Sequence, residues 1–249
     1  VCSDKTGTMT KGEMTVQRIY VNRKPVTVTG VGYEPRGEFL FEEKTLNPLD
    51  GTDLPTLLRI GTLCNDAKLQ NEEGKWTIEG DSTEGALIVA AAKASLRKED
   101  LEKEEPRIGE VPFSSERKRM TTIHDLAGRG KVAYMKGAPE IVLRQCSKII
   151  KDGEIQKLTV EDREDLLRTT EAMATQALRN LGFAYRELPE TTRVFDEAIE
   201  KDFVFVGLTG MIDPPREEVK DAIDSCEKAG IKVVMITGDH KLTAVAVAK

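Results

Sequence analysis

The feature that most constrains the fold is a pattern near the end of the chain. Residues 203–213 (FVFVGLTGMID) and 231–237 (IKVVMIT) are continuous apolar runs, and residues 214–230 between them have helical periodicity and end at a glycine. Continuous apolar runs are typical of strands buried on both faces of a parallel sheet. Strand, helix, strand at this spacing is a βαβ unit. The pattern therefore predicts an α/β domain in which both runs are parallel strands.

The first residues of the chain supply a further strand of this domain. Residues 1–3 are apolar or small, and they lead directly into Asp4. Ligands of parallel sheets gather at the carboxyl ends of the strands, and Asp4, Asp213 and Thr237 all stand at such ends. This convergence predicts an active site at one edge of the sheet, formed by both ends of the chain.

The middle of the chain has a different pattern of apolar and polar residues. Residues 15–30 alternate like a β-hairpin with its turn near Asn22, and residues 107–137 contain three strands that lead into a helix opened by Pro139. Residues 159–181 have the periodicity of a long amphipathic helix. These elements predict an α+β domain with a mixed antiparallel sheet.

We therefore expect two domains. Residues 1–10 and 204–249 would form the α/β domain, and residues 11–203 would form the α+β domain, inserted after the Asp4 strand. The chain starts within a predicted strand and stops within a predicted helix, so we expect it to be part of a longer protein and the α/β domain to be incomplete.

Composition narrows the class of protein. The chain of 249 residues has a formal charge of −6, which argues against nucleic acid as a partner. Its longest apolar run, residues 86–92, is far shorter than the ~20 residues of a membrane-spanning helix. The four cysteines and two histidines are widely spaced and predict neither a zinc site nor a disulfide framework. His124 is expected at the surface or at a sheet edge.

Four motifs in order, SDKTGTMT, KGAPE, MIDPPR and MITGDH, span nearly the whole chain. In sequence and separation they resemble the P-type cation-transporting ATPases. The segments LCNDA and GDSTEGAL are similar to the type II branch of that family, which includes calcium and sodium/potassium pumps. The chain lacks the His-Pro pair that marks the heavy-metal branch.

The resemblance implies a haloacid-dehalogenase-like, Rossmannoid phosphorylation domain around Asp4. It also implies that Asp4 attacks the γ-phosphate of ATP and becomes an aspartyl phosphate, a reaction open to a carboxylate that is ionised at neutral pH. Phosphoryl transfer depends mainly on positioning and charge neutralisation. Mg²⁺ is expected at Asp4 and the backbone carbonyl of Thr6. The groups expected around the transferred phosphate are Lys5, Thr6, Thr237, Gly238 and Asp239.

The resemblance further implies that the middle domain binds the nucleotide. Phe113 matches the aromatic residue that stacks on adenine, and Lys136 matches the lysine that lines the adenine pocket. Ser115 stands where calcium pumps of the sarcoplasmic type have an arginine, which leaves Arg117 and Arg119 as candidate replacements. The other nucleotide-binding residues implied are Asp81, Glu84, Met120, Gly137, Arg179 (at the phosphates), Asp213 and Arg216.

Two other functions stay open: a soluble phosphatase of the same fold, and a nucleotide-binding module without turnover. Such phosphatases commonly have a second Asp two residues after the nucleophile, and Thr6 at that position argues against a phosphatase. A further Mg²⁺-binding motif of the family is expected beyond residue 249, so we expect this chain alone to bind ATP but to phosphorylate Asp4 poorly. The implied partners are ATP and the transmembrane and actuator domains of the same polypeptide, at the cytoplasmic face of a membrane. The transported cation is not expected to bind this chain.

Overall fold

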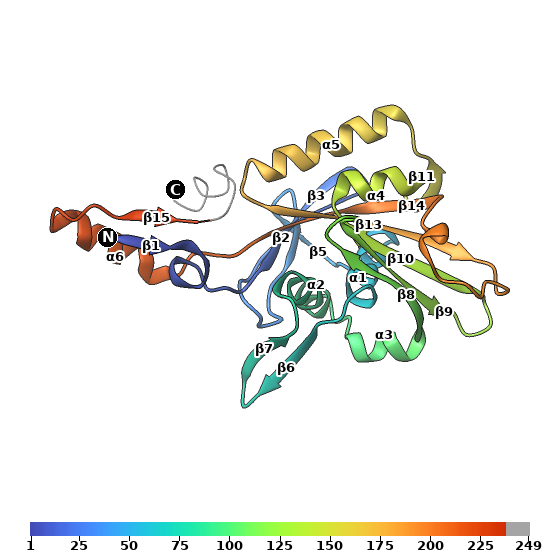
Figure 1. Cartoon of the computed structure of the whole chain (residues 1–249), viewed down its shortest axis with the longest axis horizontal. Helices are drawn as coiled ribbons and strands as arrows, with labels where there is room; N and C mark the ends of the chain where they lie inside the picture. The colour runs from blue at the N-terminus through green and yellow to red at the C-terminus, as the bar shows by residue number, and fades with distance from the viewer. Residues whose placement is uncertain (238–249) are drawn as a thin grey trace.

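The computed structural model describes residues 1–237, and the body of the molecule is an eleven-stranded, mainly antiparallel sheet (Figure 1). The strands follow the order β5-β4-β3-β2-β14-β13-β10-β9-β8; β11 pairs in parallel with β14, and β12 pairs with β11. The β2–β3 hairpin and the run of three strands β8, β9 and β10 confirm the sequence predictions. The strands are β2 (Thr15–Val21), β3 (Lys24–Val28), β4 (Phe39–Phe41), β5 (Lys44–Leu46), β8 (Arg107–Ser114), β9 (Arg119–Asp125), β10 (Lys131–Gly137), β11 (Cys146–Lys151), β12 (Glu154–Lys157), β13 (Arg179–Leu188) and β14 (Phe203–Ile212).

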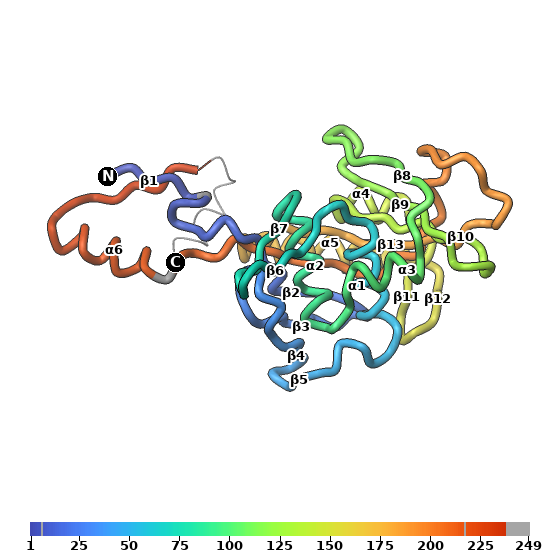
Figure 2. The backbone as a smooth tube through the Cα atoms, turned by 90° about the horizontal axis from the view of Figure 1, so that it is seen from below, coloured from blue at the N-terminus to red at the C-terminus, as the bar shows by residue number. Residues whose placement is uncertain are grey.

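Helices cover both faces of this sheet. Figure 2 shows from below the face that carries the first three α-helices of the chain. On that face, Leu57 and Phe183 belong to one apolar core; on the other, Val142 and Phe205 belong to a second. Among residues 1–237, no helix is both long and apolar enough to cross a bilayer. The first face carries α1 (Asp53–Leu63), α2 (Ser82–Lys93) and α3 (Lys98–Glu104), and the second carries α4 (Pro139–Gln145) and α5 (Val160–Ala174). A separate hairpin, β6 (Lys68–Glu72) and β7 (Lys75–Glu79), and a short turn, η2 (Glu197–Ile199), complete the body.

Strand β14 occupies the centre of the large sheet. Residues 203–211 are all buried, β13 pairs along one side of the strand, and β11 and β2 share the other side. We predicted this apolar run as a parallel strand paired within the α/β domain, and that prediction is wrong: the strand belongs to the large sheet, where it is antiparallel to β13 and β2 and parallel only to β11. A central antiparallel strand covered by helices on both faces is as continuously apolar as a parallel one, so the run of residues does not distinguish the two.

The two ends of the chain pair as predicted. β1 (Cys2–Asp4) lies parallel to β15 (Val234–Ile236), and α6 (Glu217–Lys228) precedes β15. With the helical turn η1 (Lys5–Met9), these elements form a small unit at one end of the molecule (Figure 1). The predicted helix end is confirmed at Gly230, whose φ of 72° suits a residue without a side chain.

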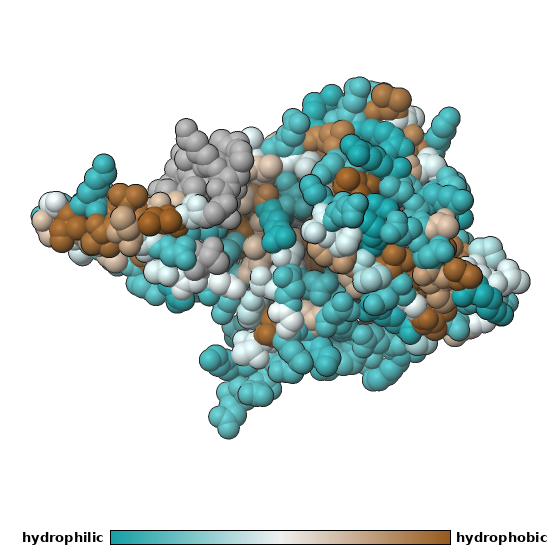
Figure 3. Space-filling model, in the orientation of Figure 1, coloured by the Kyte–Doolittle hydropathy of each residue, from teal (hydrophilic) through white to brown (hydrophobic). Residues whose placement is uncertain are grey.

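The small unit is more exposed than its apolar sequence suggests. We predicted β15 as a buried strand over residues 231–237, whereas it has three residues, and Val234 and Ile236 are exposed. Val1 is also exposed, and Figure 3 shows hydrophobic residues gathered at this end of the molecule. The two strands and one helix of this unit that lie within residues 1–237 offer too little surface to cover these side chains.

Helix α5 illustrates how local signals set the element boundaries. The Thr159 side chain accepts from the Asp162 backbone N–H, and the Asp162 side chain accepts from the Thr159 N–H, so the two residues form a capping box. The helix ends at Ala174, earlier than the predicted span of 159–181. Arg179 instead begins strand β13, and this change of element places it at the end of an interior strand of the large sheet, between β14 and β10.

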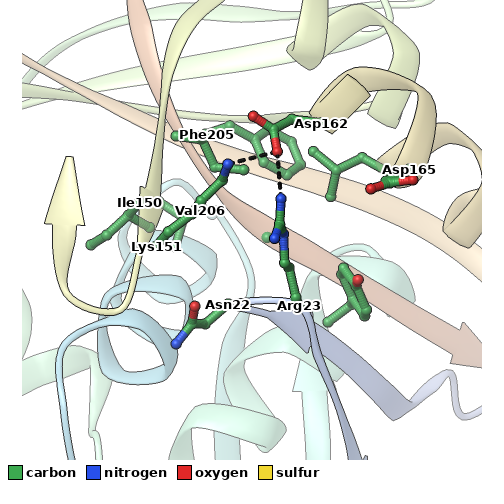
Figure 4. A pocket seen from close by; sticks show the side chains of 12 residues that line it. Asn22, Arg23, Ile150, Lys151, Asp162, Asp165, Phe205 and Val206 are labelled. Carbon is green, nitrogen blue, oxygen red and sulfur yellow. Dashed lines mark hydrogen bonds and ion pairs between the residues drawn. The ribbon is translucent and has the colours of Figure 1, made fainter. Parts of the chain in front are cut away.

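The Asp162 carboxylate also joins three elements (Figure 4). Lys151 from β11 donates to it at 2.6 Å, Arg23 from the β2–β3 turn donates at 3.0 Å, and the Thr159 hydroxyl donates at 2.8 Å. Burial alone would raise the pKa of Asp162, but the hydrogen bonds from Lys151, Thr159 and Arg23 outweigh it and hold the pKa well below its usual range. The cavity beside it, about 20 Å³, has room for about one water molecule. We assign this cluster a structural role.

His124 lies in the core, so its predicted position at the surface or edge is wrong. It is fully buried in β9, and its Nδ1 donates to the Glu105 carbonyl at 2.9 Å. That bond leaves Nε2 to accept from the Thr122 hydroxyl, also at 2.9 Å. Both ring nitrogens are therefore satisfied within the protein.

Candidate nucleotide-binding site

An open cleft of about 510 Å³ lies on the large sheet beside the N-terminus of α2. Its walls come from the start of α2, the end of β8, the start of β9, the end of β10 and the start of β13. Seven residues that the sequence predicted for nucleotide binding line it: Asp81, Glu84, Phe113, Met120, Lys136, Gly137 and Arg179. The other lining residues are Thr83, Lys118, Ala138, Asn180 and Leu181.

The register of the sheet brings these residues together. β10 is antiparallel to both of its neighbours, so the end of β10 meets the starts of β9 and β13. Lys136 stands opposite Met120 on one side and opposite Phe183 on the other. A Cβ on Gly137 would lie 2.5 Å from the Lys118 carbonyl oxygen. Only glycine permits this close approach, and the floor of the cleft depends on it.

Two acidic residues of the cleft are engaged by the protein itself. Glu84 accepts from the Lys136 ammonium at 2.5 Å and from the Asp66 backbone N–H at 3.0 Å. Asp81 caps α2 by accepting from the backbone N–H groups of Thr83 and Glu84. Lys136 is only 7% exposed, so its charge is balanced inside the cleft wall.

The remaining features favour an aromatic, anionic ligand. Phe113 is 63% exposed although it is a large apolar side chain, and its ring is available for stacking. In the part of the chain that the structure describes, Lys118 and Arg179 form no ion pair, so both charges are available to an anion. The Thr83 hydroxyl is buried and has no hydrogen-bond partner among the described residues. The cleft thus combines a stacking surface and two available cations, beside a buried hydroxyl without a partner among the described residues.

Sequence reasoning missed Thr83 and Lys118. Thr83 lies in the GDSTEGAL motif, so its proximity to Asp81 and Glu84 could have indicated it. Lys118 has a positive φ of 53° in the β8–β9 turn, and only the turn geometry directs it to the cleft. Arg117 and Arg119 were the candidates to replace the arginine that is absent at Ser115. Both instead contact Glu200, each at 2.7 Å.

Asp213 and Arg216 do not line the cleft. They lie where residues 9–12 run beside residues 213–216, between the large sheet and the small unit. Asp213 accepts from the Thr10 hydroxyl and from the Gly12 N–H, and Arg216 donates to the carbonyls of Thr10 and Gly7. The structure places both residues in the connection between the two units.

The residues predicted for phosphoryl transfer lie at the other end of the molecule. Asp4 ends β1, is exposed, and stands opposite Ile236, so that Thr237 follows on the adjacent strand. Gly238 and Asp239 lie outside the described residues. Within residues 1–237 there is no group of three or more His, Cys, Asp or Glu side chains that could hold a metal ion.

Comparison with known proteins defines the family. The model of the P-type ATPase cytoplasmic domain N matches residues 53–218, which include every residue that lines the cleft. The chain therefore belongs to the P-type ATPases and contains their N domain. This agrees with a mixed α/β fold built on a large antiparallel sheet.

Curated relatives match over the whole chain. It is 42% identical to a calcium-transporting ATPase of Bacillus subtilis and covers 28% of that protein. It is 43% identical to the cation-transporting ATPase pma1 of Synechocystis, again covering 28%, and 39% identical to calcium-transporting ATPase 1 of Lactococcus lactis, covering 26%. The chain thus spans about a quarter of the length of these relatives.

Proposed function

We propose that the cleft binds ATP, with adenine against Phe113 and the phosphates towards Arg179 and Lys118. The observation that carries this proposal is convergence: seven residues selected from the sequence between positions 81 and 179 line one cleft. The exposed ring offers a π-face, and the two cations would attract the triphosphate. Lys136 and Met120 would bound the base from the floor of the cleft.

We further propose that Asp4 accepts the γ-phosphate in the whole protein. One carboxylate oxygen would bond to the γ-phosphorus while the bond from that phosphorus to the β–γ bridging oxygen breaks, and ADP leaves with the bonding electrons. The residues proposed around the transferred group are Lys5, Thr6, Thr237, Gly238 and Asp239. In the full-length protein, acid-stable label from γ-labelled ATP should appear, and Asp4→Asn should abolish it.

Mg²⁺ fits the donor set at Asp4. This ion takes one or two carboxylates and completes its shell with phosphate oxygens and water. When bound, it would neutralise charge on the phosphoryl oxygens. We propose that the Asp4 carboxylate and the Thr6 backbone carbonyl hold it.

For the domain organisation, we propose a haloacid-dehalogenase-like phosphorylation domain formed by both ends of the chain, with the nucleotide domain inserted. The expected boundary at residues 203 and 204 would separate β14 from β13 and β2, its neighbours in the sheet. We therefore place this boundary after Ile212. The first boundary stays at residues 10 and 11, next to the connection formed by Thr10 and Asp213.

The names of the relatives support a wider proposal for the whole protein. They are calcium- or cation-transporting ATPases, and we propose that the full polypeptide is an ATP-driven cation pump. Its transmembrane and actuator domains would be supplied by the rest of the polypeptide. The present chain would then lie at the cytoplasmic face of the membrane.

Calorimetric titration of this chain with ATP tests the binding proposal. Phe113→Ala should weaken binding by about 5- to 150-fold, since stacking on an aromatic side chain is worth ~1–3 kcal/mol. Ile155→Ala is the matched control, because Ile155 is an exposed apolar residue on β12 that does not line the cleft. Equal affinity of Phe113→Ala and Ile155→Ala would refute the proposed adenine position.

A further inference from the structure

Glu200, which follows the turn η2, is an ionisable group outside the cleft with an unusual set of contacts. Its side chain is 0% exposed. One carboxylate oxygen accepts from Arg117 and from Arg119, each at 2.7 Å, and the other accepts from the Thr121 hydroxyl at 2.7 Å. The three donors are alternate residues of the β8–β9 turn and the start of β9, 79 to 83 positions away in sequence. A buried carboxylate with this many charged donors holds them in one arrangement.

Arg117 connects Glu200 to the backbone next to Phe113. While its Nη1 donates to Glu200, its Nη2 donates to the Pro112 carbonyl at 2.5 Å. That carbonyl belongs to the peptide bond between Pro112 and Phe113, so the guanidinium links a buried carboxylate to the backbone that bears the ring. The planar fork of arginine can make both contacts at once.

The pairing of β8 with β9 does not hold Pro112 and Phe113 in place. Its register shifts between the pair Val111–Thr121 and the pair Ser114–Arg119, so Pro112 and Phe113 lie in an irregular stretch. The Phe113 ring is exposed and gains little from packing. The Glu200–Arg117 contact is therefore a hydrogen-bonded anchor for this stretch from outside the hairpin.

We propose that Glu200 is a positioning residue for the adenine platform and acts on Phe113 through Arg117. The inference rests on the proposed ATP site. Glu200 does not line the cleft, and its effect would come from holding the Pro112–Phe113 peptide in place. Loss of Glu200 would leave the ring present but poorly oriented, at a cost in nucleotide affinity.

A double-mutant cycle on the whole chain tests this inference, with ATP affinity measured by calorimetry and folding checked by urea unfolding. Glu200→Gln keeps the size of the side chain but removes its charge. Alone it should weaken ATP binding about fivefold, and in the Phe113→Ala background it should weaken binding less than about twofold. Glu197→Gln is the matched control: Glu197 also approaches Arg117, at 3.6 Å, but its side chain is 65% exposed, and its loss should leave affinity unchanged.

The outcomes separate the two proposals. No effect of Glu200→Gln, or an equal loss of affinity in both backgrounds, would overturn the positioning role while the ATP site stands. A neutral Phe113→Ala would overturn the adenine position and this inference together. If Glu200→Gln does not fold, Arg117→Lys is the second variant: an ammonium group can pair with Glu200 but cannot span to Pro112, so the same coupled loss is expected, and its absence would overturn the role.

Discussion

The hydroxyl of Thr10 donates a hydrogen bond of 2.5 Å to the carboxylate of Asp213, 203 residues later in the chain. Thr10 is fully buried, and Asp213 also accepts from the Gly12 N–H at 2.9 Å. Around this pair the Lys11 N–H donates to Pro214, and the Arg216 N–H donates to Met9. The two segments that join the large sheet to the small unit are thus bound to each other, and Asp213 is the centre of the contact.

Removing the hydroxyl of Thr10 should destabilise this connection without affecting the cleft. Thr10→Val leaves a buried carboxylate oxygen without its donor, and we expect a loss of about 1–3 kcal/mol in the free energy of unfolding, measured with urea. Thr10→Ser keeps the hydroxyl and should be much milder. Affinity for ATP should be unchanged in both. A loss in Thr10→Ser as large as in Thr10→Val would contradict the role given to the hydroxyl.

Neutralising Glu84 should weaken ATP binding. The Lys136 ammonium is nearly buried and depends on Glu84 for its counter-charge, so Glu84→Gln should disturb the orientation of Lys136. We expect about 3- to 10-fold weaker binding in calorimetry, which corresponds to the net value of one ordinary hydrogen bond. Glu79→Gln is a suitable control, because Glu79 is an exposed acid paired with Lys68. Unchanged affinity in Glu84→Gln would argue against a role for this ion pair.

Asp162 should stabilise the fold in a pH-dependent way. Its pKa is held well below the usual range in the folded protein, so below about pH 4 the unfolded chain takes up a proton first and the stabilisation is lost as pH falls. At pH 7, Asp162→Asn should lower the free energy of unfolding by about 2–4 kcal/mol. The difference between wild type and variant in urea unfolding should narrow in acid.

Asp165→Asn controls for general charge effects on helix α5. Asp165 is 42% exposed and pairs with Arg168 one turn along the helix. Its replacement should change stability by less than about 0.5 kcal/mol. Equal losses in the two variants would show that the contacts of Asp162 with Lys151 and Arg23 contribute nothing specific.

His124 should stay neutral well below the usual pH of histidine titration. Burial lowers its pKa to about 4, against the opposing effect of its bond to Glu105. Below about pH 6.5 the unfolded chain is protonated first, so this residue makes the protein less stable as pH falls towards 4. NMR of the ring in a His240→Gln chain, which has a single histidine, should show no titration between about pH 7.5 and 5. A midpoint near 6.5 would contradict the buried position.

Local chemistry explains what could be predicted from the sequence. The helix start at Pro139, the turn at Asn22 and the stop at Gly230 depend on local backbone preferences, so short stretches carry the information. The motifs also identified seven residues that line the cleft. The prediction that both ends of the chain share one domain is confirmed by the pairing of β1 with β15, although the first strand of the predicted strand–helix–strand unit belongs to the large sheet.

The sequence by itself determined most of the elements and the kinds of side chain available to a nucleotide site. Only the tertiary structure decided which strands and side chains contact one another. It placed β14 in the large sheet and buried His124, and it paired Glu200 with both arginines that were candidates for the cleft. These outcomes depend on the register of strands far apart in the chain. The sequence shows whether a segment is apolar or a residue is charged, but the residue that it contacts depends on how the whole sheet packs.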